Sequence, residues 1–451
     1  MSATPVPEEA PPPWPAGPEE GRGPFDPSEV LRGRLVRLEP WGPGHAREMA
    51  IPGGTGPVEP WRGIPSEAPR ATDLLRPEDP AVGPLLPWTA YAVRGGLRGP
   101  LVGSLVLEEI DLRNRSITAR PVRIAPAWTG LGLERDAGWA LLSHAFERVG
   151  VHRVGWRVRA TDAAGRASVE AIGSVPEASL RDRRRSEGGG WETELLYGIL
   201  RAEWPVHRER LWRELPGSTV PPAPPRAAPV VPPEPDPGEP PPRWASSFRG
   251  PVVLQGPSVE LVPMEARWSA DLWRALRDPE VWRWLRFAPP TSEEAMRTLV
   301  EAMLSEWAQG SLLPFVVHSR RLDRAVGVFR YLHIDRRDGA VEFGTWLDPA
   351  VWRTGVNRET KWLALRHAFE DEGFRRVEFR TDRGNLRSRA AIEGLGATFE
   401  GEIREHVWRG APGWRTSRVY SILATEWPAL RGRLDPTARA TPARSGAVAS
   451  P

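Results

Sequence analysis

The chain repeats itself, and this internal repeat constrains its fold more than any other feature of the sequence. Glu203-Trp204-Pro205 recurs as Glu426-Trp427-Pro428, 223 positions later, and His144-Ala145-Phe146-Glu147 recurs as His367-Ala368-Phe369-Glu370 at the same spacing. The same spacing also relates Gly33 to Gly256, Val36 to Val259, Leu38 to Leu261 and Pro40 to Pro263. Chance does not hold one register over most of a domain, so we predict a tandem duplication.

The repeat and the local composition together divide the chain of 451 residues. We predict two folded domains, at 30–214 and 250–434, each long enough to bury its own core. Residues 1–28 are dominated by Pro, Glu, Gly and Ala and are expected to be disordered, as is the tail 435–451. Between the domains, 215–249 carries Pro-Pro and Pro-x-x-Pro runs, which favour an extended, semi-stiff spacer.

The composition excludes several classes of protein. There is no cysteine, so neither a disulfide framework nor a thiolate metal site is available. No apolar run approaches membrane-spanning length and the N-terminus does not resemble a secretory signal, so we expect a cytoplasmic protein with no membrane partner. The net charge is only +3, and nearly every cation is arginine, Lys361 being the only lysine. Cations and anions are interspersed, so we expect no nucleic-acid partner.

The second repeat has the pattern of an α/β domain. Strands are predicted at Val259–Met264, Leu313–His318 and Ala325–Ile334, helices at Trp268–Arg286 and Ser292–Gln309, and two closing strands at about 397–409 and 415–423. Gly410-Ala411-Pro412-Gly413 has the composition of a hairpin turn between the closing strands.

The stretch from Val341 to Gly396 organises this repeat. It predicts a strand at Val341–Leu347, a loop and a helix, a strand at Val377–Thr381, and a second helix for which Asn385 is the N-cap. Strands that alternate with helices in this way indicate a central parallel strand pair with both faces covered.

The first helix of this stretch begins with a pattern suited to an anion. A glycine, Gly355, lies between two arginines, Arg353 and Arg358, at the helix start. Unpaired backbone N–H groups and the positive end of the helix dipole both face such a loop, so the pattern predicts a phosphate site. The alternative is an ordinary strand-to-helix turn.

Three motifs then occur in a characteristic order. They are Glu342-Phe343-Gly344 on a strand, Thr354-Gly355-Val356-Asn357-Arg358-Glu359 at a helix start, and Thr381-Asp382 with Asn385 and Ser388, followed by Leu395-Gly396. In this order they resemble the acetyl-CoA core of the GNAT superfamily of N-acetyltransferases. The likeness is greatest to the ribosomal-protein-alanine N-acetyltransferase (RimJ/RimL) group, and it extends to Glu426-Trp427.

The resemblance implies a fold and a co-substrate. The fold would be two tandem GNAT-like domains, each a mixed, mostly antiparallel sheet with a central splayed parallel strand pair flanked by helices. Acetyl-CoA would be the co-substrate, without a metal. The residues expected to hold it are Leu347, Arg353, Thr354, Gly355, Val356, Asn357, Arg358 and Asn385. The family's commoner loop has Gly or Ala at the position of Asn357.

The resemblance also assigns catalytic roles. Glu342 would be the base that accepts the amine's proton, through a water molecule; the alternative is a structural carboxylate paired with a nearby arginine. Asn385 would orient the pantetheine or a water, or act only as an N-cap. Ser388 would protonate the leaving thiolate, or be a simple helix-surface serine. The backbone from Thr345 to Leu347 would polarise the thioester carbonyl.

These roles predict acetyl transfer to a primary amine by direct attack, since no cysteine exists to carry a covalent intermediate. The favoured acceptor is the α-amine of a protein N-terminus, and a small amine such as an aminoglycoside or polyamine is the alternative. A non-catalytic acyl-CoA-binding scaffold is a third possibility. Retention of Glu342, Asn385 and Ser388 in one repeat argues against it.

The first repeat keeps the scaffold pattern and loses the chemistry. Ala119 stands in place of Glu342, and an alignment through Thr161-Asp162 and Thr381-Asp382, at a spacing of 220, places Gly165 at the position of Asn385. Glycines and prolines between Ile51 and Trp88 exclude long early helices. Trp128-Thr129-Gly130-Leu131-Gly132 keeps a glycine-rich helix start. We expect a catalytically silent copy that packs against the active one; whether this copy binds coenzyme stays open.

Other conspicuous residues have structural interpretations. His144 and His367 lie within helices next to phenylalanines, so they are expected to pack or to lie on the surface. No group of His, Asp and Glu has metal-ligand spacing. The tryptophans Trp273, Trp282, Trp284 and Trp307 are expected mainly in the core, although those on the early helices could line the acceptor cleft.

Overall fold

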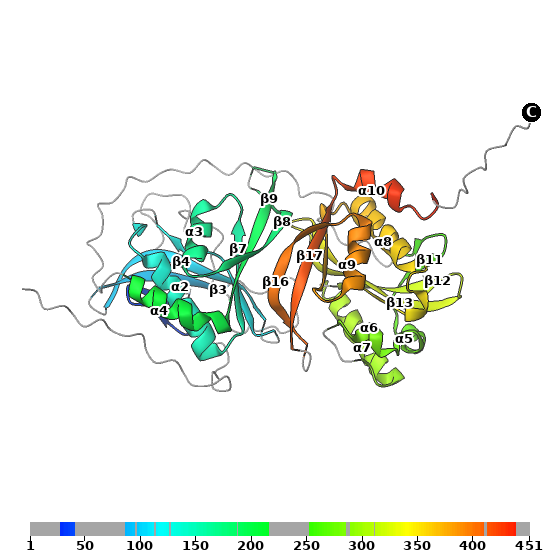
Figure 1. Ribbon diagram of the computed structural model, residues 1–451, viewed down its shortest axis with the longest axis horizontal. Helices are drawn as coiled ribbons and strands as arrows, with labels where there is room; N and C mark the ends of the chain where they lie inside the picture. The colour runs from blue at the N-terminus through cyan, green and yellow to red at the C-terminus, as the bar shows by residue number, and fades with distance from the viewer. Residues whose placement is uncertain are drawn as a thin grey trace, which may run out of the picture.

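The structure is a computed structural model that describes residues 28–40, 86–94, 97–111, 114–125, 128–186, 188–215, 252–285, 289–310, 312–409 and 413–438. These residues form two halves that lie side by side along the long axis of the molecule (Figure 1). The predictions made for the two tails, for the spacer and for the Gly- and Pro-rich stretch of the first repeat fall almost entirely outside the described residues, as does most of the 410–413 turn.

The second half contains a mixed sheet. Its strands are β10 (Leu254–Gln255), β11 (Val259–Pro263), β12 (Leu312–Ser319), β13 (Arg324–Asp335), β14 (Ala340–Leu347), β15 (Arg376–Asp382), β16 (Thr398–Trp408) and β17 (Trp414–Leu423). They pair in the order β10-β11-β12-β13-β14-β15-β17-β16, and every pair is antiparallel except β14–β15, which is parallel. The predicted mixed sheet with a central parallel pair is therefore confirmed.

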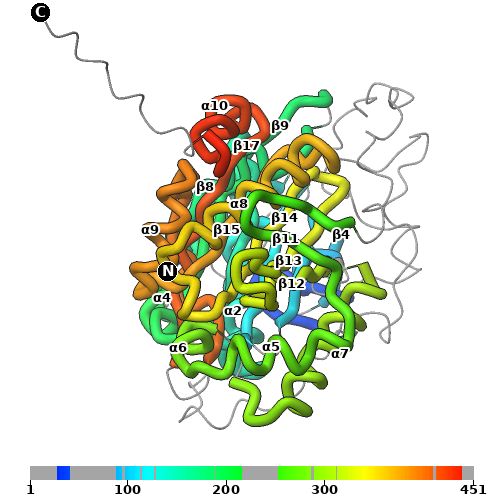
Figure 2. The backbone as a smooth tube through the Cα atoms, turned by 90° about the vertical axis from the view of Figure 1, so that its right-hand side faces the viewer, coloured from blue at the N-terminus to red at the C-terminus, as the bar shows by residue number. Residues whose placement is uncertain are grey.

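Helices cover both faces of this sheet. They are α5 (Ser269–Leu276), α6 (Pro279–Trp282), α7 (Glu293–Ala308), α8 (Val356–Arg366), which continues as a π-helix at His367–Asp371, α9 (Leu386–Leu395) and α10 (Trp427–Leu434), with short 3-10 turns at Ala266–Trp268 and Pro349–Val351. Helices α5–α7 lie on one side of the strands, and α8 and α10 lie on the other (Figures 1 and 2). A separate hydrophobic core fills each side.

One predicted helix is broken in the structure. The expected helix from Trp268 to Arg286 is interrupted after Leu276, and α6 begins at Pro279. The Asp278 side chain accepts a hydrogen bond from the backbone N–H of Glu280, which caps the new helix. Proline lacks an N–H and fits only the first turn of a helix, so a second start replaces a continuous helix here.

The described elements of the first half follow the same order, except that none corresponds to α5–α7 and a short strand, β6, is added. Its strands are β1 (Leu31–Arg32), β2 (Val36–Pro40), β3 (Leu86–Arg94), β4 (Leu97–Asp111), β5 (Ser116–Ala119), β6 (Arg123–Ile124), β7 (Arg153–Arg159), β8 (Val175–Arg185) and β9 (Trp191–Leu200), and its helices are α2 (Leu133–Ser143), a π-helix at His144–Val149, α3 (Ala163–Ala171), a 3-10 turn at Arg201–Glu203 and α4 (Trp204–Glu214). Here too one central pair, β5–β7, is parallel.

The register of the strands corrects one detail of the sequence comparison. Arg153 pairs with Leu200 in the first half and Arg376 pairs with Leu423 in the second, so the spacing of 223 holds through this region. It also continues into the next helix. Asp162 caps α3 just as Asn385 caps α9, each accepting a hydrogen bond from the N–H three residues later. Asp162, not Gly165, is therefore the counterpart of Asn385.

Both halves fasten the first helix of the core to the start of the sheet in the same way. In the second half the carboxylate of Glu359, on α8, accepts hydrogen bonds from the backbone N–H groups of Ser258 and Val259, at 2.8 and 2.9 Å. Asp136, on α2, does the same at the start of β2. A side chain at Gly256 would overlap the Glu359 carboxylate, which explains why this position is a glycine.

The two sheets join into one through their edge strands, β8 and β16. Strand β8 pairs antiparallel with β16 at Ala178 and Gly401, and these two positions are themselves 223 residues apart. The join is therefore a pairing of equivalent strands, so the halves are related by an approximate two-fold axis. A small apolar cluster of Ala178, Leu180, Leu196, Ile403 and Val419 lies at this join.

Ion pairs across the join obey the same symmetry. Arg181 contacts Glu400 and Glu426 of the second half, and Arg404, its counterpart, contacts Glu177 and Glu203 of the first. Each arginine also donates to a backbone carbonyl of the other half, Ser421 for Arg181 and Gly198 for Arg404. Each of these contacts between the halves thus occurs twice, at positions 223 residues apart.

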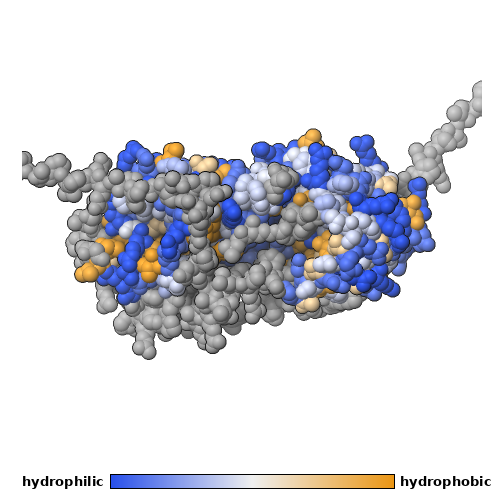
Figure 3. Space-filling model, turned by 90° about the horizontal axis from the view of Figure 1, so that it is seen from below, coloured by the Kyte–Doolittle hydropathy of each residue, from blue (hydrophilic) through white to orange (hydrophobic). Residues whose placement is uncertain are grey.

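Figure 3 shows one face of the molecule, on which most of the coloured side chains are hydrophilic and hydrophobic residues form small scattered groups. None of the described helices is long and apolar enough to cross a membrane.

Candidate active site

The parallel strands β14 and β15 separate part-way along their length. Their pairing begins at Ala340 and Arg376 and ends at Phe343 and Phe379, although β14 continues to Leu347. Beyond this point the edge of β14 that faces β15 has no strand partner in the described part of the chain. A cavity of about 630 Å³ opens in the gap, between the start of α8, helix α9 and strand β17.

The start of α8 forms one end of this cavity. Gly355, with φ of 98°, is the N-cap, and no side chain caps the first turn. Arg353 also has a positive φ, 64°. The first N–H groups of α8 are therefore left for another acceptor, as expected at an anion site.

Cations gather at the same end. Arg353 and Arg358 line the cavity together with Arg387 of α9, which lies 3.3 Å from the ring centre of Trp352. Burial, with repulsion from Arg353, lowers the pKa of Arg387. Cations that repel one another favour binding of a polyanion such as a pyrophosphate.

The predicted coenzyme residues divide into two groups. Leu347, Arg353, Gly355, Asn357, Arg358 and Asn385 line the cavity. Two others are turned away from it, since Thr354 donates its hydroxyl to the carbonyl of Val351 and Val356 packs in the core. Only the backbone of Thr354 and Val356 can serve the predicted role.

Glu342 lines the cavity and is held by two partners. It is 9 % exposed, and its Oε2 lies 2.9 Å from Nδ1 of His333, on β13, and 3.4 Å from Nε of Arg380, on β15. Burial raises the pKa of this carboxyl, but Arg380 and His333 together outweigh burial and hold the pKa below its usual value. Glu342 is therefore ionised at neutral pH, and the arginine partner of the alternative interpretation is present as well.

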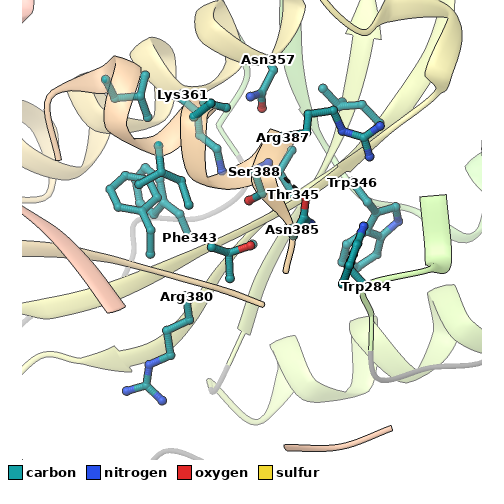
Figure 4. A pocket seen from close by; sticks show the side chains of 18 of the residues that line it. Trp284, Phe343, Thr345, Trp346, Asn357, Lys361, Arg380, Asn385, Arg387 and Ser388 are labelled. Atoms are coloured by element: carbon teal, nitrogen blue, oxygen red, sulfur yellow. Dashed lines mark hydrogen bonds between the residues drawn. The ribbon is translucent and has the colours of Figure 1, made fainter. Parts of the chain in front are cut away.

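Asn385 and Ser388 face the same cavity from α9 (Figure 4). The Asn385 side chain accepts a hydrogen bond from the backbone N–H of Ser388 at 3.1 Å, so its predicted N-cap role is confirmed. The Ser388 side chain borders the cavity. The structure therefore brings Glu342, Asn385 and Ser388 to one cavity from two elements.

Residues 259–398 match the family described as acetyltransferase (GNAT) domain. The second half contains a GNAT acetyltransferase domain. The protein is accordingly an acyltransferase.

The chain is similar to several solved structures, and the three that follow each correspond to less than half of it. A GCN5-related N-acetyltransferase from Brucella melitensis is 25% identical, with 42% of this chain and 86% of that chain covered and a TM-score of 0.40. A probable acetyltransferase of the GNAT family from Chromobacterium violaceum is 31% identical, with 45% and 99% covered and a TM-score of 0.38. RimL, a ribosomal-protein α-N-acetyltransferase, is 17% identical, with 40% and 97% covered and a TM-score of 0.36. No curated protein matches the chain.

The GNAT domain has a site residue that sequence reasoning missed. Lys361, on α8, is 6 % exposed and lines the cavity. Its Nζ donates a hydrogen bond to the Thr345 hydroxyl, and burial lowers its pKa to about 7. The signal was present in the composition, because this is the only lysine in the chain.

His333 and Arg380 were missed too. Both hold Glu342, and both come from strands that neighbour β14. His333 follows a register shift in β13 and has a positive φ of 47°. That irregularity turns its ring toward Glu342, and nothing in the sequence pattern marks it.

Two tryptophans also line the GNAT domain's cavity. Trp284 and Trp346 lie beside Asn385 (Figure 4), and the Trp284 ring packs close to Gly384. Trp284 is the one of the four singled-out tryptophans that lines the cavity; Trp282 is buried, and Trp273 and Trp307 pack against the cores.

The histidines of the repeated motif are structural. His367 is 3 % exposed, and its Nδ1 lies 3.0 Å from the hydroxyl of Tyr331. Burial lowers its pKa to about 4, so it stays neutral. His144 is also buried. Among the described residues, no group of three or more His, Cys, Asp or Glu could hold a metal ion.

Proposed function

We propose that the GNAT domain transfers the acetyl group of acetyl-CoA to a primary amine, and that the α-amine of a protein N-terminus is the favoured acceptor. The observation that carries the proposal is the gap between β14 and β15. It connects an uncapped, cationic helix start at one end with an ionised carboxylate, Glu342, at the other. The cationic end suits the phosphates of a long polyanionic thioester, and the carboxylate end suits an amine that must lose a proton.

The helix start serves the phosphates. Arg353 and Arg358 supply charge, and the backbone of Gly355, Val356 and Asn357 supplies N–H donors. The free edge of β14, from Thr345 to Leu347, supplies N–H and carbonyl groups to the pantetheine arm and polarises the thioester carbonyl. Asn385 orients the arm from α9.

Glu342 accepts the proton of the amine through a water molecule. Because Arg380 and His333 keep its pKa low, Glu342 is a weak base, and it suits an amine that is already partly neutral. An α-amine, with an ordinary pKa of about 8, fulfils this condition better than a lysine or polyamine nitrogen near 10.4. This comparison supports the N-terminal acceptor over a small polyamine.

The first half is, in this proposal, a degenerate copy that arose by tandem duplication. The repeated element order and the symmetric ion pairs of Arg181 and Arg404 support the duplication. Ala119 occupies the place of Glu342, so the copy lacks the base. It instead supports the site from outside: His152 stacks on Trp414 at 3.9 Å, and Asn114 accepts a hydrogen bond from the N–H of Trp408.

Both of these contacts hold the β16–β17 hairpin, whose Arg415 lines the cavity. The copy therefore acts as a built-in dimer partner. If the isolated segment 250–434 proved fully soluble and active, this supporting role would fail.

Calorimetric titration of acetyl-CoA tests the coenzyme site. Arg358→Glu places a carboxylate at the first turn of α8, and Arg135→Glu makes the same change at the equivalent position of α2. We expect one binding site in the wild type, lost in Arg358→Glu and unaffected in Arg135→Glu. Gly355 is a poorer choice, because its φ of 98° would strain any side chain. Absence of binding to the wild type would refute the enzyme proposal.

An acceptor screen tests the rest. Peptides with a free N-terminus are compared with the same peptides carrying a blocked N-terminus and one internal lysine, and with aminoglycosides and polyamines. We expect acetylation of free N-termini only, with turnover by Glu342→Gln reduced about 100-fold or more. Acetylation of the small amines alone would replace the proposed acceptor.

A further inference from the structure

The chain has a single lysine, Lys361, and it lines the cavity of the GNAT domain. Every other cation among the 61 Lys and Arg residues is an arginine, so the sequence avoids lysine wherever the two can be exchanged. Arginine holds its proton at every physiological pH, whereas a buried lysine releases its proton readily. A unique lysine in the cavity therefore indicates a need for proton transfer. The equivalent position in the silent copy is Gly138.

Lys361 lies where the two central strands part. Its Nζ is 5.5 Å from the ring centre of Phe343 and 5.7 Å from that of Phe379, the last residues that pair across the strands. Its hydrogen bond goes to Thr345, the second residue of the free edge. Figure 4 shows the side chain reaching from α8 toward Thr345 and Ser388. The amine thus lies at the floor of the gap that the pantetheine arm would enter.

The charges around Lys361 leave it without a counter-ion. The charged side chains that share its cavity are Glu342 of β14, Arg380 and Asp382 of β15, Arg353 and Arg358 at the start of α8, Arg387 of α9, Arg330 of β13 and Arg415 of β17. In the described part of the chain neither carboxylate pairs with Lys361: Glu342 is held by Arg380 and Asp382 by Arg409. Burial alone lowers the pKa of Lys361, to about 7.

We propose that Lys361 donates the proton that converts the departing CoA thiolate to a thiol. The inference rests on the proposed acetyl transfer. As the amine nitrogen bonds to the carbonyl carbon, the carbon–sulfur bond breaks and its electron pair goes to sulfur, which takes a proton from Nζ. Lys361 then regains a proton from water, and the protons of the amine leave through Glu342.

Acid strength favours Lys361 over Ser388 for this step. A thiol has an ordinary pKa of about 8.5, so a donor with a pKa near 7 transfers its proton downhill. A serine hydroxyl is a far weaker acid. In this mechanism Ser388 helps to hold the arm and is not the proton source.

The test measures the thiol of bound CoA. Free CoA is bound to the wild type, to Lys361→Met and to Lys361→Arg, and thiolate formation is followed by ultraviolet absorbance as the pH is raised. The guanidinium of Lys361→Arg stays charged while the thiol titrates, so we expect the thiol pKa to be lower by about one unit or more in Lys361→Arg than in Lys361→Met. Lys361→Arg retains the charge but cannot release a proton, so kcat should fall about 100-fold.

The outcomes are distinct. Equal thiol titration in Lys361→Arg and Lys361→Met, or unchanged kcat in Lys361→Arg, would overturn the proposal. Acetylation of Lys361 after incubation with acetyl-CoA would also overturn the proposal, because the amine would then act as a nucleophile. Intact-mass and peptide analysis would detect it, and the assignment is unambiguous because the chain has only one lysine. Failure of the wild type to bind CoA would refute the proposed function instead. Melting curves confirm folding, since methionine suits a buried site.

Discussion

At the scale of single residues, two buried ionisable groups in one cavity favour opposite charge states: one is stabilised in its charged form and the other in its neutral form. Glu342 and Lys361 are both more than nine-tenths buried. Glu342 stays charged because Arg380 and His333 outweigh its desolvation. Lys361 has no counter-charge, so burial lowers its pKa to about 7. The partner, not the depth of burial, decides which form is stable.

A pH-dependent stability follows for Lys361→Met. The pKa of Lys361 is 10.5 in an unfolded chain and about 7 in the fold, so the unfolded chain binds the proton more tightly between those values. The cost of burying the charge is complete below pH 7 and disappears as the pH rises toward 10. Lys361→Met should be more stable than the wild type at pH 6, by about 5 kcal/mol at most, with the gain shrinking toward pH 10. Urea unfolding at several pH values measures this; a gain independent of pH would contradict it.

A second prediction concerns the Glu342 carboxylate. Arg380→Met removes the cation that lowers its pKa, so desolvation should raise that pKa. The acidic limb of the kcat/KM profile should then move up by about one to two pH units. Arg380→Lys keeps a charge and is the control, with a smaller displacement. An unmoved acidic limb in Arg380→Met would mean that another group is the base.

The sequence could predict Glu342 and Asn385 because each has a fixed place, one within a strand and one before a helix. It could not predict His333 or Arg380 as partners of Glu342, because they reach it from neighbouring strands whose registers arise only in the folded sheet. Lys361 was visible in the composition, yet its role depends on a cavity that no local pattern describes.

At the scale of elements, helix starts account for much of the site. The uncapped start of α8 leaves N–H groups for a ligand, whereas the start of α9 is closed by its own cap, Asn385. Local rules predicted the cap at Asn385 and missed the new helix start at Pro279. They also aligned two Thr-Asp doublets that are not equivalent, because a short identity says less about register than strand pairing does.

The two roles of Asn385 can be separated by substitution. Asn385→Asp should keep the cap and the melting temperature, as Asp162 shows at the equivalent position of α3. Asn385→Ala should lose about 1 kcal/mol. If Asn385 also contacts the coenzyme, kcat/KM should fall about tenfold or more in both variants. Asp162→Asn is the matched control: it should leave kcat/KM unchanged and lose at most about 1 kcal/mol, because Asp162 also pairs with the exposed side chain of Arg123. A loss of stability in Asn385→Asp as large as in Asn385→Ala would contradict the prediction.

At the scale of the whole molecule, the join of the two halves resembles a symmetric dimer interface. Equivalent strands pair at Ala178 and Gly401, and Arg181 and Arg404 exchange equivalent contacts. The repeat in the sequence implied two similar domains and suggested that they pack together. It could not show that the sheets merge, because which edge strands meet depends on the complete surface of each half.

Symmetry predicts matched effects at the join. Arg181→Ala and Arg404→Ala each remove one arginine from two carboxylates of the other half. Glu400 keeps Arg376 and Glu177 keeps Arg153, so only Glu426 or Glu203 loses its arginine altogether. Both arginines are partly exposed, so each variant should lose about 1–3 kcal/mol, by similar amounts. Thermal unfolding compares them. As a control, Arg213→Ala removes an exposed ion pair within α4 and should change stability by less than about 1 kcal/mol. A large difference between Arg181→Ala and Arg404→Ala would argue against equivalent contacts.

The pairing of β8 with β16 within one chain has a consequence for how the protein can vary. In a dimer of identical subunits, every substitution at the interface occurs on both sides at once. Here a substitution occurs on one side only. Because the two halves belong to one chain, their association is intramolecular and does not depend on the protein concentration. Ser421, whose hydroxyl bonds to Arg181, has Gly198 as its counterpart, and Gly401 has Ala178. One half can thus accumulate substitutions while the other keeps the residues of its site.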